Sequence, residues 1–449
     1  MACFLVLIFL IGGGSRDDIM SLIVLRPVAV LACGFALLTL RSEHVANYRG
    51  VFAVLAVVFM LLVVELVPLP FALWSALPGR EIVVEVDRLT GAGELWRPIS
   101  MVPSATWNAL YALFIPSAVV LLAAQLRREE RFQILPIVIG LGAVSGVVGL
   151  LQVAGGSEGP LYFYRITNRD SAVGLFSNRN HAAVLLAVTF PMLAVYASSG
   201  AKTIEQARFR AWVAMVIGVV LLPLILVTGS RAGMVVAIVG IAAAAFLYRK
   251  PTFDRPAKRK IRRVNLAYVL GGFVVVGLAL LFALFSRAKA LERLLAPDQV
   301  EDLRFKIWGP IVEMMWKYFP VGSGIGTFSE VYQVDEPFSL LSPTYVNHAH
   351  NDWLELAMTG GVPALLVLLV VVCGFAIWSL SAWRTAGLQE GRDGKYARLA
   401  SVILFILALS SLGDYPLRIP SLSALGALCA IWLCGIRTQN RGSADGPQK

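Results

Sequence analysis

Residues 347–372 read NHAHNDWLELAMTGGVPALLVLLVVV, a polar cluster that leads directly into a long apolar run. Two of the chain's four histidines lie at its start, and an Asn, an Asp and a Glu follow them closely. The apolar run continues to about residue 383, which is long enough to cross the ~30 Å hydrocarbon core of a bilayer. The stretch therefore predicts a membrane-spanning helix that begins among ionisable side chains.

The rest of the chain shares this apolar character. Of its 449 residues, 58% are hydrophobic and 15% are charged, whereas soluble domains carry about 45–50% apolar and about 25% charged residues. We therefore expect an all-α fold, a polytopic transmembrane helical bundle that forms a single integral membrane domain over residues 1–449. Apolar runs of suitable length predict about 12 spans, at residues 2–14, 20–40, 51–68, 104–125, 132–153, 181–198, 211–228, 232–248, 265–286, 356–383, 396–412 and 419–436.

The charges between these runs predict the topology. The net charge of +11 does not indicate nucleic-acid binding, because the basic residues gather in short loops. Residues 249–263 alone hold eight basic residues and one acidic residue. By the positive-inside rule this loop, both termini and the tail 437–449 are cytoplasmic. The alternate loops are then external, and two of them, 69–103 and 287–355, are long.

Two further patterns limit what the chain contains. The five cysteines lie inside apolar runs without the spacing of a metal knuckle, so we expect them to be core or lipid-facing residues. The first run, 2–14, lacks the positively charged start and the small-residue cleavage site of a signal peptide, and it is short for a span.

The longer external loop contains a helical pattern. In residues 305–319, FKIWGPIVEMMWKYF, apolar side chains recur at helical spacing, which predicts an amphipathic helix in the membrane interface. The apolar positions are Trp308, Ile311, Val312, Met315 and Phe319.

The predicted topology brings separated polar clusters to the external face. Ionisable residues that face the interior of a bundle commonly mark a substrate path. The clusters come from five parts of the chain: Asn178, Arg179, Asn180 and His181; Arg231; Arg304; His348, His350 and Asn351; Asp414 and Arg418.

These residue types suit one kind of chemistry. Arginine presents a planar fork that matches phosphate oxygens, and Arg231 lies in the first turn of an expected helix, where the dipole also favours an anion. A histidine near its usual pKa of ~6.5 can accept a proton from an attacking hydroxyl. Each element also has a simpler interpretation: arginines snorkel to lipid headgroups, SNRNH caps a helix, and DYPLR forms a turn. A metal held by His348, His350 and Asp352 is a further alternative, which the scarcity of external carboxylates disfavours.

At this point the sequence resembles the O-antigen ligase and polymerase superfamily of membrane glycosyltransferases. The resemblance covers roughly residues 165–436. Four motifs carry it: GLFSNRNHAAVLLA at 174–187; TGSRAGMV with Arg231, where Ala232 replaces the usual Gly; RFKIWGPIVEMMWKYFPVGSGIGTF at 304–328; and HNDWLELAMTGGVPA at 350–364, a His-Asn followed after nine residues by Gly-x-x-Gly with Ala364 in the last position.

The resemblance implies an inverting C-type glycosyltransferase in the bacterial inner membrane, with its active site at the periplasmic face. Its donor would be an undecaprenyl-diphosphate-linked oligosaccharide or polysaccharide, and no metal, cofactor or nucleotide sugar would be needed. His350 matches the signature histidine, the catalytic base, and Arg231 matches the arginine that meets the donor diphosphate. Arg179 and Arg304 are further candidates for diphosphate binding. Supporting roles fall to His348, Asn351, Asn180, His181, Arg418 and Asp414.

Several functions remain open at this stage. A ligase transfers a finished glycan to lipid A–core, whereas a polymerase transfers a growing glycan to one more repeat unit, and the donor motifs do not separate them. We favour the ligase over the polymerase. Protein glycosylation would call for larger soluble regions, and a structural scaffold would not need these residues on one face. A secondary transporter, for example for inorganic carbon, would show broken helices in two matching halves, which the sequence lacks.

Overall fold

The computed structural model describes residues 1–251, 299–343, 345–384 and 392–435. In this part of the chain nearly all regular structure is helical, and the two-residue strands β1 (Pro68–Leu69) and β2 (Arg97–Pro98) form one antiparallel pair. Six helices are long and apolar enough to cross a membrane. They are α2 (Leu22–Thr39), the combined α7 and α8 (Pro103–Ala124), α9 (Arg128–Gly155), α10 (Arg179–Ala197), α11 (Ile204–Thr228) and α16 (Asp352–Arg384).

These helices confirm a helical, multi-pass membrane protein, while the number of about 12 spans stays a prediction. The span predicted at 265–286, most of the basic loop 249–263 and the tail 437–449 lie outside the described residues. The remaining elements are α1 (Ala2–Ile11), α3 (Ser42–Asn47), α4 (Arg49–Glu65), α5 (Phe71–Trp74), α6 (Glu81–Thr90), α12 (Arg231–Leu247), α14 (Gln299–Tyr318), α15 (Phe328–Asp335), η1 (Phe338–Leu340), α17 (Arg392–Ser410), η2 (Pro416–Arg418) and α18 (Pro420–Cys434).

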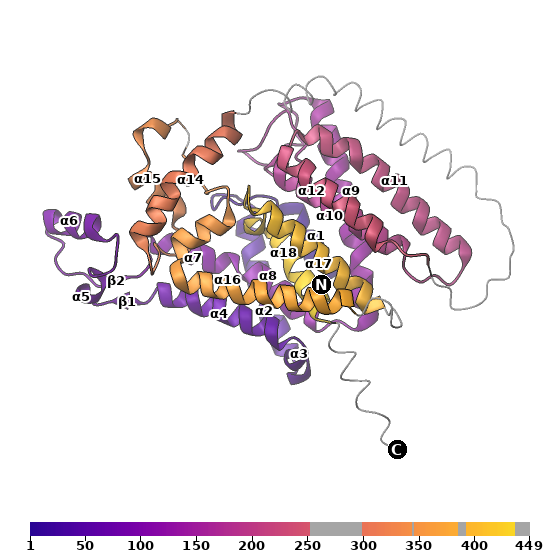
Figure 1. Ribbon diagram of the computed structural model, residues 1–449, viewed down its shortest axis with the longest axis horizontal. Coiled ribbons are helices and arrows are strands. Elements are labelled where there is room, and N and C mark those ends of the chain that lie inside the picture. Colours follow the sequence, from indigo (N-terminus) through magenta and orange to yellow (C-terminus); the bar gives the residue numbers. More distant parts are fainter. Residues whose placement is uncertain (252–298, 344, 385–391, 436–449) are drawn as a thin grey trace, which may run out of the picture.

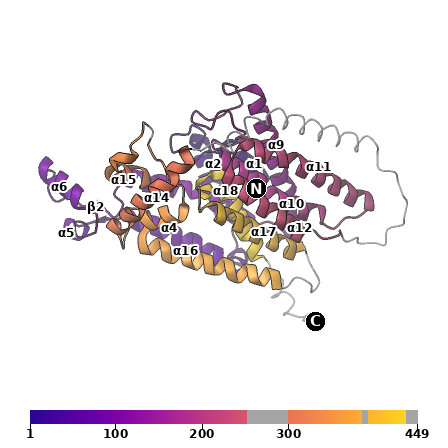
Figure 2. The ribbon, with the colours of Figure 1, turned by 45° about the horizontal axis from the view of Figure 1, so that its top comes forward.

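Helix α10 is the centre of the bundle. In α10, 89% of the most apolar stretch is buried, against 17% in α16, and α10 packs against α9, α11, α12 and α17. Its apolar side chains surround the whole helix, as expected for a helix covered on all sides. Figures 1 and 2 show α9 to α12 grouped at one end of the molecule, with α5, α6 and the strand pair at the other and α14 and α15 beside them.

The helix predicted at residues 305–319 is present as part of α14, but its buried face differs from the predicted one. Helix α14 buries Ile307, Ile311, Met314 and Tyr318, which pack with residues of α15 and α16. Val312 and Phe319 are 40% and 42% exposed, although the sequence pattern placed them on the apolar face. A packing partner on one side of the helix selects the buried row, and helical spacing alone does not reveal where that partner lies.

A glycine-rich turn at residues 320–326, called the glycine turn below, packs against a break in α16. The backbone of α16 leaves helical geometry at Gly361 (φ 54°, ψ −152°), the first glycine of the Gly-x-x-Gly motif. Across this break the N–H of Val362 donates to the carbonyl of Pro320 at 2.8 Å, and the N–H of Gly324 donates to the carbonyl of Thr359 at 2.8 Å. The break therefore positions the segment that precedes it, which includes His350.

Buried charged side chains hold the other side of this turn. Arg80 is fully buried and donates to the carbonyls of Pro78, Ile99 and Gly322 at 2.8, 2.6 and 3.0 Å. Glu65 accepts the N–H of Ile325 at 2.8 Å. The contacts of Arg80 therefore join the loop 69–103 to the glycine turn. They also supply the hydrogen-bond acceptors that a buried guanidinium needs.

Gly361→Ala should destabilise the protein by roughly 1–3 kcal/mol or more, because this backbone region is nearly restricted to glycine. An added Cβ would also lie 2.3 Å from the carbonyl oxygen of Pro320. Gly140→Ala is the matched control, since Gly140 is exposed within α9 and its Cβ would meet no atom within 4 Å. Thermal unfolding in detergent measures both, and an unchanged Tm for Gly361→Ala would contradict the role of the break.

Candidate functional site

Two helices begin side by side at one end of the bundle. Asn178 caps α10 by accepting the N–H of Asn180 at 2.8 Å, and Ser230 caps α12 by accepting the N–H of Gly233 at 2.8 Å. The Ser230 hydroxyl also donates to the Asn180 side-chain oxygen at 2.7 Å. Asn and Ser are preferred caps, so the sequence itself favours helix starts here. We call this end, where α16 also begins, the site face.

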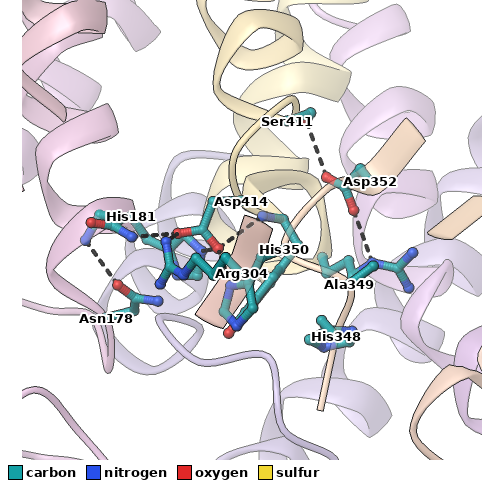
Figure 3. Close-up of polar contacts among 12 residues, drawn as sticks. Asn178, His181, Arg304, His348, Ala349, His350, Asp352, Ser411 and Asp414 are labelled. Carbon is teal, nitrogen blue, oxygen red and sulfur yellow. Dashed lines mark hydrogen bonds and ion pairs between the residues drawn. The ribbon is translucent and has the colours of Figure 1, made fainter. Parts of the chain in front are cut away.

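Side chains from distant parts of the chain surround a single buried carboxylate (Figure 3). Asp414, 3% exposed in the turn between α17 and α18, accepts the Asn180 amide at 2.6 Å. His350 Nδ1 lies 3.3 Å from its Oδ1, and His181 Nε2 lies 3.6 Å from the same oxygen. Arg304 of α14 lies 3.7 Å from its Oδ2. The structure thus brings together four of the clusters that the sequence analysis assigned to one face.

The electrostatics of this group favour a charged aspartate. Burial acts to raise the pKa of Asp414, but His181, Arg304 and His350 outweigh burial and hold that pKa well below 3.8. The pKa of His350 is lowered below 6.5, first by burial and then by the nearby Arg304, against the raising effect of Asp414. An anionic acceptor therefore faces an imidazole that is neutral near pH 7, which suits a proton-accepting role.

The backbone of His350 is held in an uncommon conformation. Its φ of 50° lies in the left-handed region, which non-glycine residues rarely adopt. Its side chain is 15% exposed, and its Nδ1 faces Asp414. Because Nδ1 is directed at the carboxylate, Nε2 is the ring nitrogen that can exchange a proton with a bound molecule. Strained residues of this kind concentrate at functional sites.

Tyr415 contacts three histidine rings of the cluster, and it was not among the predicted site residues. Its ring centroid lies 5.0, 4.3 and 5.0 Å from those of His181, His348 and His350. Tyr415 follows Asp414 directly, and its N–H donates to the Asp414 carboxylate at 3.0 Å. One aromatic ring therefore fixes the separation of three imidazoles. Its place in the DYPLR segment was the available signal, but a turn was the simpler interpretation of that segment.

A second polar network lies beside the first. Glu355, 1% exposed in α16, lies 3.2 Å from His348 Nδ1 and 3.1 Å from the Arg418 guanidinium, and it accepts the N–H of Ala349 at 2.9 Å. Arg418 also donates to Asp352 at 2.9 Å. Glu355 was not among the predicted site residues, although it lies within the His-Asn motif. The network fixes the short segment that carries both histidines.

The remaining predicted residues lie at helix starts. The Asn351 side-chain oxygen accepts the N–H groups of Trp353 and Leu354 at 3.1 Å each, so Asn351 caps α16. Arg179 and Arg231 are the first residues of α10 and α12, are partly exposed, and adjoin Asn180 and Ser230 in the chain. Within the described residues, no group of three or more His, Cys, Asp and Glu side chains is arranged to hold a metal ion.

Asp414→Asn should lower the free energy of unfolding by roughly 3–5 kcal/mol, the cost of removing one partner from a buried charged group. The lowered pKa of Asp414 contributes stability above about pH 3.8, and this is lost as the pH falls through the folded-state pKa. The difference in the free energy of unfolding between the variant and the natural protein should therefore become smaller below about pH 4. Thermal unfolding in detergent at neutral and acidic pH checks this, and equal Tm values at pH 7 would contradict it.

Comparison with known protein families gives one match. A family model described as O-Antigen ligase matches residues 213–369, a range that includes Arg231, Arg304, His348 and His350. The model does not extend to His181 or Asp414, which the fold brings to the same place. No curated protein matches the chain. This match confirms the resemblance of residues 213–369 to the O-antigen ligase family.

Proposed function

We propose that the protein is an inverting, C-type glycosyltransferase with O-antigen ligase-like activity in lipopolysaccharide or related polysaccharide biosynthesis. It transfers a glycan from an undecaprenyl-diphosphate-linked donor to an acceptor hydroxyl. The observation that carries the proposal is the pair formed by His350 and Asp414, at 3.3 Å, among arginines at the site face. A neutral imidazole oriented by a buried carboxylate is a suitable general base.

The proposed transfer uses the His350–Asp414 pair. His350 Nε2 accepts the proton of the acceptor hydroxyl as its oxygen attacks the anomeric carbon of the donor. The bond between that carbon and the diphosphate oxygen breaks, and the diphosphate leaves with the electron pair. Attack from the face opposite the leaving group inverts the anomeric configuration. Asp414 holds the imidazole through Nδ1 and stabilises the imidazolium that forms.

The arginines supply the positive charge that the leaving diphosphate needs. Arg231 begins α12, so the guanidinium fork is combined with the positive end of a helix dipole. Arg179 begins α10, whose start is joined to that of α12 by the hydrogen bond between Ser230 and Asn180. Arg304 lies against Asp414 and contributes charge to the same region. In this proposal Arg231 is the principal diphosphate ligand.

The loop charges and the family resemblance support a location for the reaction. In this proposal the protein lies in the bacterial inner membrane with both termini cytoplasmic, and the site face is periplasmic. A lipid-linked donor reaches such a site from the bilayer, and the acceptor is lipid A–core or a growing glycan.

His350→Ala should lower transfer roughly 10²–10⁴-fold, the usual contribution of a general base. His44→Ala is the control, since His44 lies in α3 and its side chain accepts a local hydrogen bond from the Arg41 N–H at 3.2 Å. Both variants and Arg231→Ala are expressed in a deletion strain, and lipopolysaccharide and lipid-linked glycan are extracted together.

The pattern of products separates the alternatives. Missing ladders on lipid A–core with accumulated long lipid-linked polymer support a ligase, whereas accumulated single lipid-linked repeat units indicate a polymerase. Wild-type patterns from both site variants would overturn the assignment and favour transport.

The pH profile gives an independent check. His350 must be neutral to act as base, so activity should fall as the pH drops through its lowered pKa, below 6.5. Asp414 raises the pKa of His350 by its hydrogen bond and its charge. Asp414→Asn should therefore lower kcat and move the acid limb to lower pH. Transfer by purified protein across pH 4.5–8 measures the limb, and a shift to higher pH would contradict the pairing.

A further inference from the structure

The segment between α1 and α2 is attached to the site face by its backbone. The carbonyl of Gly12 accepts the N–H of Ser421, and the carbonyl of Gly13 accepts the N–H of Ser177, at 3.0 and 3.1 Å. The hydroxyl of Tyr164 accepts the N–H of Gly13 at 2.7 Å. Residues 12–21 therefore lie at the starts of α10 and α18, next to the cluster around Asp414.

A cleft of about 440 Å³ opens between this segment and the loop that precedes α10. Its apolar lining includes Met20, Phe163 and Ile166, which are 76%, 54% and 50% exposed. Its polar lining includes Arg16, Asp18 and Arg165. Exposed apolar and charged side chains around one cleft suit a ligand that has both characters.

The charged side of the cleft is net positive. Arg16 and Arg165 pair with the same carboxylate, Asp18, at 2.9 and 2.8 Å, so two guanidinium groups share one negative charge. The guanidinium of Arg16 also lies 5.4 Å from the ring centroid of Tyr345, in the segment that leads to His348. The cleft is therefore joined to the catalytic segment, and its charge favours an anion with phosphate-like geometry.

The cleft continues into an apolar groove. Asp18 and Met20 also line a second cavity of about 730 Å³, which runs along α2 past Ile23, Val30 and Leu31. These α2 side chains are 66%, 45% and 72% exposed on a helix long and apolar enough to span a membrane. A polar cleft that leads into such a groove matches an anionic headgroup attached to acyl chains.

We propose that this cleft binds the acceptor, a lipid-anchored glycan that carries a phosphate group. The phosphate lies between Arg16 and Arg165, a sugar ring packs on Phe163, and the acyl chains follow α2. The donor diphosphate is assigned to Arg231, on a different element, so the second substrate needs its own site on the same face. The role of this lipid as the acceptor rests on the proposed function, whereas its binding in the cleft does not require transfer.

Photo-cross-linking tests this binding directly. p-Benzoylphenylalanine replaces Ile166 in the full-length protein in nanodiscs, and Leu366, a 58% exposed residue of α16, is the control position. The probe is a radiolabelled, acylated glucosamine disaccharide phosphate. Labelling at position 166 should exceed labelling at position 366 and be competed by the unlabelled probe. Equal labelling at the two positions would overturn the proposal.

Charge-reversal variants of two arginines test the role of the cleft arginines in binding. Arg165→Glu should reduce the labelling at least about tenfold, the scale of one lost charge-assisted hydrogen bond. Arg169→Glu is the matched control, because Arg169 lies in the same loop, pairs with Glu158 and does not line the cleft. Equal effects of the two variants would overturn the role of the cleft arginines.

Two outcomes separate this proposal from the proposed function. Competition by undecaprenyl diphosphate in place of the disaccharide phosphate would make the cleft a donor site and overturn the assignment. His350→Ala should lose transfer but keep the cross-link. If His350→Ala keeps full transfer while the cross-link persists, the catalytic assignment fails and the binding site stands.

Discussion

The site depends on the buried negative charge of Asp414. A carboxylate that is 3% exposed is costly unless charged or hydrogen-bonding groups surround it. Here the partners come from α10, from α14 and from the segment before α16, and they are far apart in sequence. Satisfying one charge therefore requires these elements to meet, so the carboxylate that orients His350 also determines how the site face is assembled.

The second carboxylate network gives this arrangement its rigidity. Glu355 binds Arg418 and His348, while Tyr415 contacts the rings of three histidines. In a region of low dielectric these contacts are stronger than in water, and leaving any one group unpaired is costly. The strained backbone of His350 is maintained by such surroundings. In the proposed role of His350 as the base, a side chain held in this way needs little rearrangement when a substrate binds, which is the advantage of preorganisation in catalysis.

The same face combines three sources of positive potential in the proposed reaction. The helices α10, α12 and α16 begin there, and arginines occupy the first positions of α10 and α12. The charged side chains that line the neighbouring cleft, Arg16, Arg165 and Asp18, have a net positive charge. Helix starts favour anions, and this preference is greater where water is scarce. Two anionic, lipid-anchored substrates would therefore approach one polar end of an otherwise apolar bundle from different sides.

The sequence by itself determined the helical membrane architecture, because apolar composition and run length depend only on local residues. It also selected His350, Arg231, Arg304 and Asp414 as candidate site residues, since such side chains are unusual next to apolar runs. Only the tertiary structure decided that Asp414 pairs with His350, that Tyr415 contacts three imidazoles and that Glu355 holds His348. It likewise decided which row of α14 is buried, and it brought the N-terminal segment to the site face. Most of these contacts, such as that of Asp414 with His350, join residues far apart in the chain, and local pattern carries no information about which distant partner satisfies a buried charge.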